Sequence, residues 1–218
     1  MIDKINIPWQ KLTIISILAG IIYNSWPLGY WLNPIVARRG LGSELEGLHQ
    51  PYNWLFIGGD VVSSLLIGLV AVWLWSLLRR QVHRTVFDIA LLNIGGFSVC
   101  TIVDALLPLH CDPSIQRCPS FVHDPLLLMH GIFSIAASVF LFISLLLIWW
   151  IDRRDWLLQA LLYGYVLFGI FSLIPLFTPG RNNWSQHYYL TLCSVWLAVL
   201  PYAIHRFVRE TTGRNPDL

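Results

Sequence analysis

The sequence is poor in charged residues. Asp, Glu, Lys and Arg make up 12% of its 218 residues, about half of the roughly 25% that is usual in soluble domains. This shortage excludes a soluble globular enzyme, a disordered chain and a free nucleic-acid-binding protein. The net charge of +2 is also too small to indicate an anionic partner.

Motifs for nucleotide binding and for common hydrolases are missing as well. The chain contains no G-x-G-x-x-G sequence and no P-loop, so we expect no nucleotide or flavin as a ligand. It also contains no G-x-S-x-G nucleophile motif. We therefore expect membrane lipids around the protein and no nucleic acid or nucleotide as a partner.

Apolar residues are abundant instead, at 56% of the chain with a mean hydropathy of +0.62. They fall into six long runs, each close to the roughly 20 residues that cross a bilayer as a helix. A run of this kind must be helical, because the bilayer offers no partner for unpaired backbone groups. The sequence predicts an all-α polytopic membrane bundle, a single transmembrane domain over residues 1–218 with helices at about 12–32, 54–78, 86–107, 126–150, 156–177 and 188–208.

The Lys and Arg residues indicate how this bundle is oriented. With the N-terminus inside, ten of them fall in inner segments and four in outer ones, namely Arg38, Arg39, Arg117 and Arg181. Cytoplasmic segments of membrane proteins carry an excess of Lys and Arg. We therefore expect both termini in the cytoplasm and a multi-pass protein of the plasma membrane, most simply a bacterial inner membrane.

Two of the four cysteines lie in the outer loop after the third helix. Cys111 and Cys118 are separated by six residues that include Pro and Asp, a spacing that allows their sulfurs to meet. Disulfides persist in oxidising compartments, so we predict a structural disulfide between Cys111 and Cys118. A redox-active pair and free or metal-bound thiols remain as alternatives. Cys100 and Cys193 lie within helices and are expected to pack there.

Ionisable residues inside the helices provide the candidate catalytic site. Asp60, Asp104 and His130 lie at similar depths near the outer ends of three consecutive helices. Such groups are costly against lipid and usually face the bundle interior or a water-filled cavity. We predict that these three side chains share one polar cavity in the outer half of the bundle. The alternative is that each one hydrogen-bonds a neighbouring helix and serves packing alone.

Histidines gather at the same face, where five of the seven lie. Imidazole and carboxylate groups are the ligands of catalytic zinc. The candidate metal ligands, for which zinc is a possible ion, are His110, His123, His130, His187 and Asp60. Several of these fit equally well as interfacial loop residues. His49, Glu44 and Glu46 are expected to be loop residues with a still weaker claim to a site.

One stretch of the chain resembles a known group of proteins. Asp104 followed by Pro108, then Cys111, Cys118 and His130-Gly131, resembles an uncharacterised family of bacterial six-helix membrane proteins that carries a domain of unknown function. This resemblance implies a fold and no activity. A more distant likeness is to membrane hydrolases of the alkaline-ceramidase and adiponectin-receptor type, which implies a zinc held by three His. The chain departs from them because its last helix has no His-x-x-x-His pair and one helix is missing.

Two functions from different classes follow. The first is a metal-dependent hydrolase that acts on a lipid or amphiphile, with a bound metal activating water or an Asp–His pair serving as general base. The second is a non-enzymatic protein: a carrier, a ligand-binding protein, or an assembly or scaffold component. A haem-binding electron carrier is a third option, although His130 is the one histidine well inside the predicted bilayer.

Overall fold

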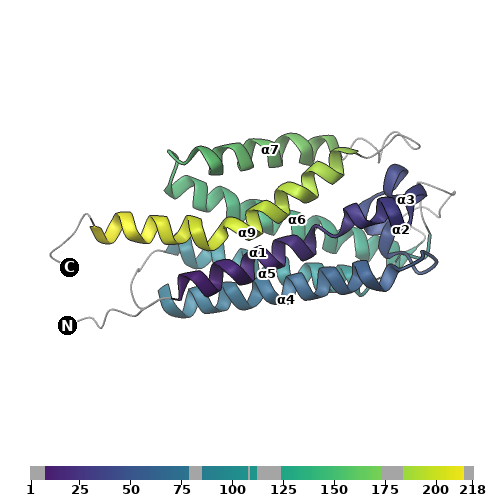
Figure 1. Ribbon diagram of the computed structural model, residues 1–218, viewed down its shortest axis with the longest axis horizontal. Coiled ribbons are helices and arrows are strands. Elements are labelled where there is room, and N and C mark those ends of the chain that lie inside the picture. The colour runs from purple at the N-terminus through teal and green to yellow at the C-terminus, as the bar shows by residue number, and fades with distance from the viewer. Residues whose placement is uncertain (1–7, 79–84, 108, 112–123, 173–183, 214–218) are drawn as a thin grey trace.

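The computed structural model describes residues 8–78, 85–107, 109–111, 124–172 and 184–213, and every regular element among them is helical. The prediction of an all-α fold is confirmed. The long helices run nearly parallel to one axis of the bundle, and both termini lie at the same end (Figure 1). In chain order the helices are α1 Trp9–Tyr23, η1 Trp26–Leu28, α2 Gly29–Leu32, α3 Pro34–Arg39, η2 Gly42–Glu46, α4 Asn53–Leu78, α5 Thr85–Ala105, α6 Pro125–Ile151, α7 Trp156–Ser172 and α9 Trp184–Gly213.

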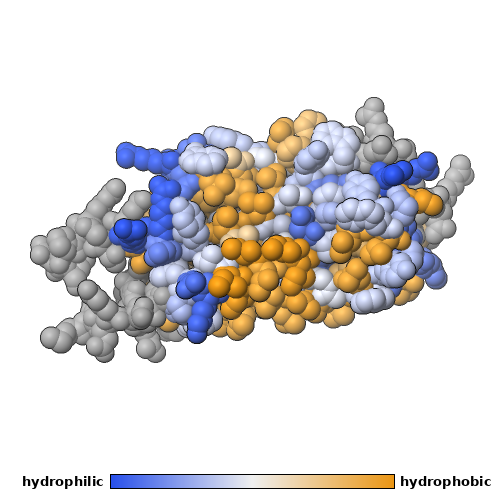
Figure 2. Space-filling view, in the orientation of Figure 1, coloured by the Kyte–Doolittle hydropathy of each residue, from blue (hydrophilic) through white to orange (hydrophobic). Residues whose placement is uncertain are grey.

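Length and hydropathy make this bundle a multi-pass membrane protein. Five segments are long and apolar enough to cross a bilayer, namely Trp9–Leu32, Asn53–Leu78, Thr85–Ala105, Pro125–Ile151 and Trp184–Arg209. The apolar helix α7 has 17 described residues, or about 26 Å at 1.5 Å per residue, so it is compatible with the predicted sixth span. Figure 2 shows an orange apolar band across the middle of the molecule, with blue hydrophilic residues gathered toward both ends.

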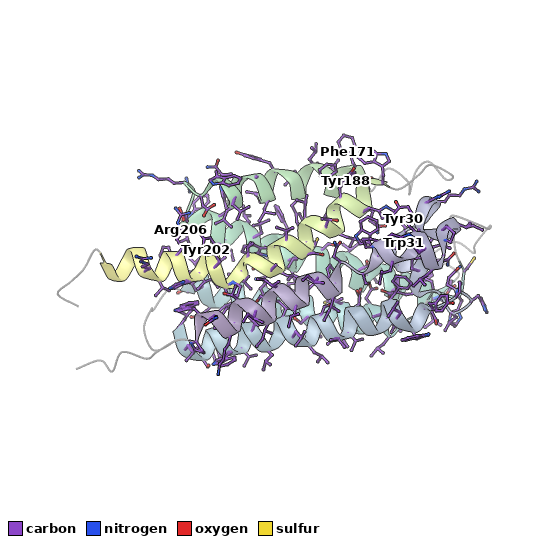
Figure 3. All side chains as sticks on the ribbon, viewed as in Figure 1. Tyr30, Trp31, Phe171, Tyr188, Tyr202 and Arg206 are labelled. Carbon is purple, nitrogen blue, oxygen red and sulfur yellow. The ribbon has the colours of Figure 1, made fainter. Side chains whose placement is uncertain are left out.

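Aromatic side chains mark the end of the bundle that lies away from the termini. Trp31 and Trp54 are 78% and 68% exposed, as expected of aromatic anchors at a membrane interface. Figure 3 places Tyr30 and Trp31 at this end, whereas Tyr202 and Arg206 lie toward the other. This end is the one that the distribution of Lys and Arg predicts to be outside.

Two predicted helices differ from the observed ones, the first by a break inside it and the last by an earlier start. The run at 12–32 forms one span, but it is interrupted after Tyr23 by a 3-10 turn, η1, whose second residue is Pro27. Proline suits the first turn of a helix because its missing N–H has no partner there in any case. The last helix begins at Trp184, four residues earlier than predicted, and continues past Pro201. Residues 173–177 of the predicted fifth helix lie outside the described residues.

The segment between the first two spans is folded, whereas the sequence suggested a plain loop. Val36 and Ala37 from α3 and Leu45 from η2 pack with Phe56 of α4 in a small apolar cluster of their own. All four side chains are at most 3% exposed. The packing of Leu45 in this cluster holds η2 against the bundle. The next residue, Glu46, is buried as a consequence.

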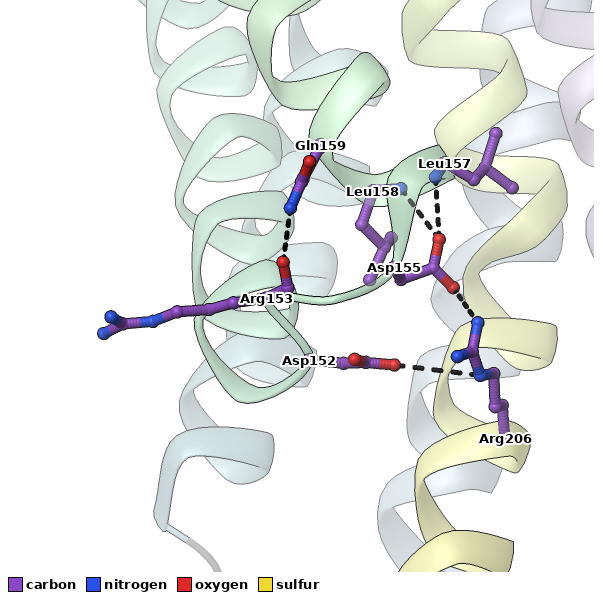
Figure 4. A network of polar contacts seen from close by, with 7 residues as sticks. All are labelled: Asp152, Arg153, Asp155, Leu157, Leu158, Gln159 and Arg206. Carbon is purple, nitrogen blue, oxygen red and sulfur yellow. Dashed lines mark hydrogen bonds and ion pairs between the residues drawn. The ribbon is translucent and has the colours of Figure 1, made fainter.

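Asp155 connects α6, α7 and α9 at the end of the bundle where both chain termini lie (Figure 4). Its Oδ1 atom accepts hydrogen bonds from the backbone N–H groups of Leu157 and Leu158 at 2.8 and 3.2 Å, which caps α7. Its Oδ2 atom lies 2.5 Å from Nη1 of Arg206 on α9. Asp152, after α6, lies farther from Arg206, at 3.8 Å from Nε. One carboxylate thus both begins α7 and holds the α6–α7 hairpin to α9.

Replacing Asp155 by alanine should lower the free energy of unfolding by about 2 kcal/mol, because loss of a helix cap costs about 1 kcal/mol and a charge-assisted hydrogen bond to a half-exposed arginine adds a similar amount. Asp155→Ser keeps a capping oxygen but cannot pair with Arg206, so it should lose about half as much. Thermal unfolding of the two variants in detergent measures this. Equal losses for both would contradict a role for the pair with Arg206.

Candidate functional site

A small polar cavity lies between α1, α4, α5, α6 and α9. Its volume is about 60 Å³, enough for about four water molecules at roughly 15 Å³ each. Because successive helices run in opposite directions, the start of α4, the end of α5 and the starts of α6 and α9 meet at the end away from the termini (Figure 1). The polar residues on the wall include Asp60, Thr101, Asp104, Ser134, Gln186 and Tyr189.

Two of the three predicted catalytic residues, Asp60 and Asp104, are on the wall of this cavity. Asp60 also shares a hydrogen bond with the side chain of Glu46. Two carboxyl groups can share such a bond only when one of them holds a proton. Burial raises the pKa of Glu46 well above its usual value, and the negative charges of Asp60 and Asp104 raise it further. Three carboxyl groups from η2, α4 and α5 therefore influence one another at one place.

The third predicted residue, His130, holds Asp104 from α6. Its Nδ1 atom lies 3.1 Å from Oδ1 of Asp104, 3.0 Å from the carbonyl oxygen of Leu107 and 3.3 Å from that of Asp104. All three neighbours are acceptors, so the proton of the neutral imidazole belongs on Nδ1. Ser134, one turn further along α6, hydrogen-bonds the side chain of Asp104. His130 lies close to the carboxyl group of Asp104 without a hydrogen bond to it, because Oδ1 of Asp104 has no hydrogen-bond partner among the described residues.

The other ring nitrogen of His130, Nε2, makes no described contact with the cavity. Nε2 is buried and has no hydrogen-bond partner among the described residues, and His130 is not one of the residues on the cavity wall. The ring contacts Asp104 from outside the cavity. Asp60 and Asp104 therefore lie on one cavity wall, and His130 contacts Asp104 from behind it. A catalytic role for the three residues stays a prediction.

The predicted metal ligands do not gather in the part of the chain that the structure describes. His187 is 4% exposed and stacks on Trp26 at 4.2 Å between ring centroids, with the hydroxyl of Tyr30 at 3.3 Å from Nδ1. His110 is exposed. No three His, Cys, Asp or Glu side chains of the described residues are placed to hold a metal ion, so these residues do not fit a zinc site. His123 lies outside the described residues, and the metal site that includes it stays a prediction.

Glu46 is the residue that sequence reasoning missed. It was expected as a loop residue of little weight, but it is 7% exposed and bonded to Asp60. Little in the sequence signals this burial, because Glu44 and Glu46 flank Leu45 in a stretch rich in Gly, Ser, Arg and His that resembles an ordinary loop. Thr101 was missed for another reason: a hydroxyl inside an apolar helix is usually satisfied by its own backbone.

The cysteines separate into two kinds. Cys100 and Cys193 are free and buried, as predicted, and Cys193 is on the cavity wall. Cys118 lies outside the described residues, so the disulfide stays a prediction. Because the chain has four cysteines and two of them are free thiols, Cys118 is the one cysteine left for Cys111 to pair with.

Comparison with known proteins identifies a family, but the description of that family names no activity. Residues 16–207, nearly the whole chain, match the family described as Protein of unknown function (DUF998). No curated protein and no solved structure matches the chain. The expected membership in an uncharacterised family is confirmed, and the likeness to zinc-dependent membrane hydrolases stays a prediction.

Proposed function

The chain belongs to the DUF998 family, and from its acidic cavity we propose that it is a membrane carrier for a small, positively charged solute. The observation that carries this proposal is the acidic character of the cavity wall. Asp60 and Asp104 face the cavity, Glu46 bonds to Asp60, and the described residues that line the cavity include no Lys or Arg. Carboxylates in a low-dielectric interior need a compensating positive charge or a proton. A small cation supplies that charge reversibly.

The size of the cavity favours a carrier over a lipid hydrolase. Sites for drug-sized ligands have volumes of about 300–1,000 Å³, whereas this cavity measures about 60 Å³. His130 is also not one of the residues that line the cavity, so the Asp104–His130 pair does not offer an imidazole base to a molecule there. The metal-dependent hydrolase remains the competing hypothesis.

Orientation adds to this proposal. We place both termini in the cytoplasm of a bacterial cell, on the basis of ten inner against four outer Lys and Arg residues. The cavity then lies in the outer half of the membrane, and the Cys111–Cys118 disulfide forms in an oxidising compartment. A cation would enter from outside.

Uptake into proteoliposomes tests the carrier. We expect wild-type protein to take up labelled sodium, calcium or methylammonium down an imposed gradient, and Asp104→Asn to reduce this uptake at least about tenfold, since each carboxylate contact of a buried cation contributes more than 1.4 kcal/mol. Asp88→Asn is the matched control, because Asp88 is an exposed carboxylate at the other end of the same helix. Uptake equal to that of empty liposomes for all three probes would refute the carrier. Release of fatty acid from the lipids that depends on Asp104 would establish the hydrolase instead.

A further inference from the structure

The donors on the cavity wall have a common chemistry. Asp60 and Asp104 supply carboxylate oxygens, and Thr101 and Ser134 supply hydroxyl oxygens. Cys193 is the one sulfur among the described lining residues, and it hydrogen-bonds with Tyr189 and Tyr165. His130 contributes no ring atom to the wall. Oxygen donors of this kind are the ligands of hard cations, with several ligands and an adaptable geometry for calcium.

Thr101 supplies independent evidence for a ligand. Two other polar side chains of α5 bond to their own helix: Asn93 donates to the carbonyl of Ile89 at 2.8 Å and Ser98 to that of Ile94 at 3.0 Å. Thr101 is 4% exposed, and its Oγ1 atom has no hydrogen-bond partner among the described residues. A buried hydroxyl left unpaired costs about 1–3 kcal/mol. A species in the cavity that accepts its lone pair would remove this cost.

We propose that the cavity holds one hard metal cation, of the sodium or calcium type, bound by carboxylate oxygens of Asp60 and Asp104 and by the hydroxyl oxygen of Thr101. This assignment rests on the proposed function and narrows its solute to a metal ion. A volume of about 60 Å³ accommodates the ion with two or three waters, which bring the oxygen ligands to about six. Zinc and other metals that need imidazole or thiolate are poor occupants, because the described lining residues include no histidine and the thiol of Cys193 is hydrogen-bonded to Tyr189 and Tyr165.

Thermal unfolding of purified protein in detergent tests the site apart from transport. The protein starts in choline chloride and receives sodium, potassium, magnesium or calcium chloride. A ligand that binds the folded state raises the melting temperature in a saturable way. We expect such a rise with sodium or calcium, and the ion that saturates at the lower concentration is the native type.

Substitutions at single hydroxyls identify the site. Thr101→Val replaces the hydroxyl by a methyl of the same shape and should weaken the affinity about tenfold, whereas Thr101→Ser should retain it. Ser144→Ala is the matched control, because Ser144 is fully buried with an unpaired hydroxyl on α6 but is not on the cavity wall. It should leave the affinity unchanged.

The outcomes separate this inference from the carrier itself. No saturable shift with any of the four chlorides, or a shift that Thr101→Val leaves unchanged, would overturn the metal site. Methylammonium uptake without metal binding would keep the carrier and refute the inference. Metal binding that depends on Thr101 but comes with no uptake would establish the site and refute the carrier.

Discussion

Replacing Gly20 by alanine should lower the free energy of unfolding by about 2–3 kcal/mol, which is the upper range for overpacking. A methyl group at this position would lie 2.5 Å from the backbone carbonyl oxygen of Ser194 and 3.1 Å from Cβ of Ala198, both on α9. A side chain could rotate out of the way, but a helix backbone cannot. The contact between α1 and α9 must therefore widen along its length.

Gly95→Ala is the control for this substitution. Gly95 lies inside α5, and no atom of the described residues is within 4 Å of the position where its methyl group would be placed. Alanine is the better helix former by up to about 1 kcal/mol, so this variant should be as stable as wild type or more stable. Melting temperatures in one detergent compare the two. Similar values for Gly20→Ala and wild type would show that α1 and α9 do not pack as tightly as described.

The contact between α1 and α9 at Gly20 also positions residues on the cavity wall. Tyr23 follows Gly20 by one turn on α1, and Tyr189 and Cys193 come just before Ser194 on α9; all three are on the cavity wall. Widening the space between α1 and α9 moves these walls apart. Gly20→Ala should thus weaken cation binding as well as folding, although Gly20 itself is not on the wall.

Much of the fold follows from the sequence, because length and hydropathy alone decide which segments can cross a bilayer. The helix boundaries are less predictable. A window of about 20 residues averages the short stretch from Asn24 to Pro27 into the apolar residues on both sides, so a hydropathy profile does not reveal the break after Tyr23. The depth of α9 in the bundle likewise comes from packing, which a hydropathy profile does not contain.

The site could be predicted in part for a similar reason. Asp60, Asp104 and His130 are visible in the sequence because ionisable groups within apolar helices are costly. Glu46 lies between helices, where a carboxylate normally costs nothing. Its burial depends on Leu45, which docks η2 through contacts with residues distant in the sequence. The surroundings of His187 were equally hidden in the sequence, because its ring stacks on Trp26, which lies far from it along the chain.

Glu46→Gln should make the protein more stable at pH 8 than wild type, with a difference that shrinks toward pH 5. Burial raises the pKa of Glu46 in the folded protein, and the negative charges of Asp60 on α4 and Asp104 on α5 raise it further. Above about pH 4.3, the usual value for glutamate, the unfolded chain releases the proton that the folded protein retains. The contribution of Glu46 to stability therefore falls as the pH rises toward its folded pKa. Glutamine has no proton to release and can still donate a hydrogen bond to Asp60.

Thermal unfolding in choline buffers between pH 5 and pH 8 measures this difference without competing metal ions. Glu46→Ala breaks the hydrogen bond to Asp60 and leaves buried space, so it should be less stable than wild type by about 1–3 kcal/mol at pH 5. Asp88→Asn, which removes an exposed carboxylate far from the cavity, should leave the pH dependence of wild type unchanged. If Glu46→Gln and wild type lose stability in parallel from pH 5 to pH 8, the carboxyl group of Glu46 does not titrate against Asp60. The segment η2 would then contribute no charge to the cavity, and its acidity would come from α4 and α5 alone.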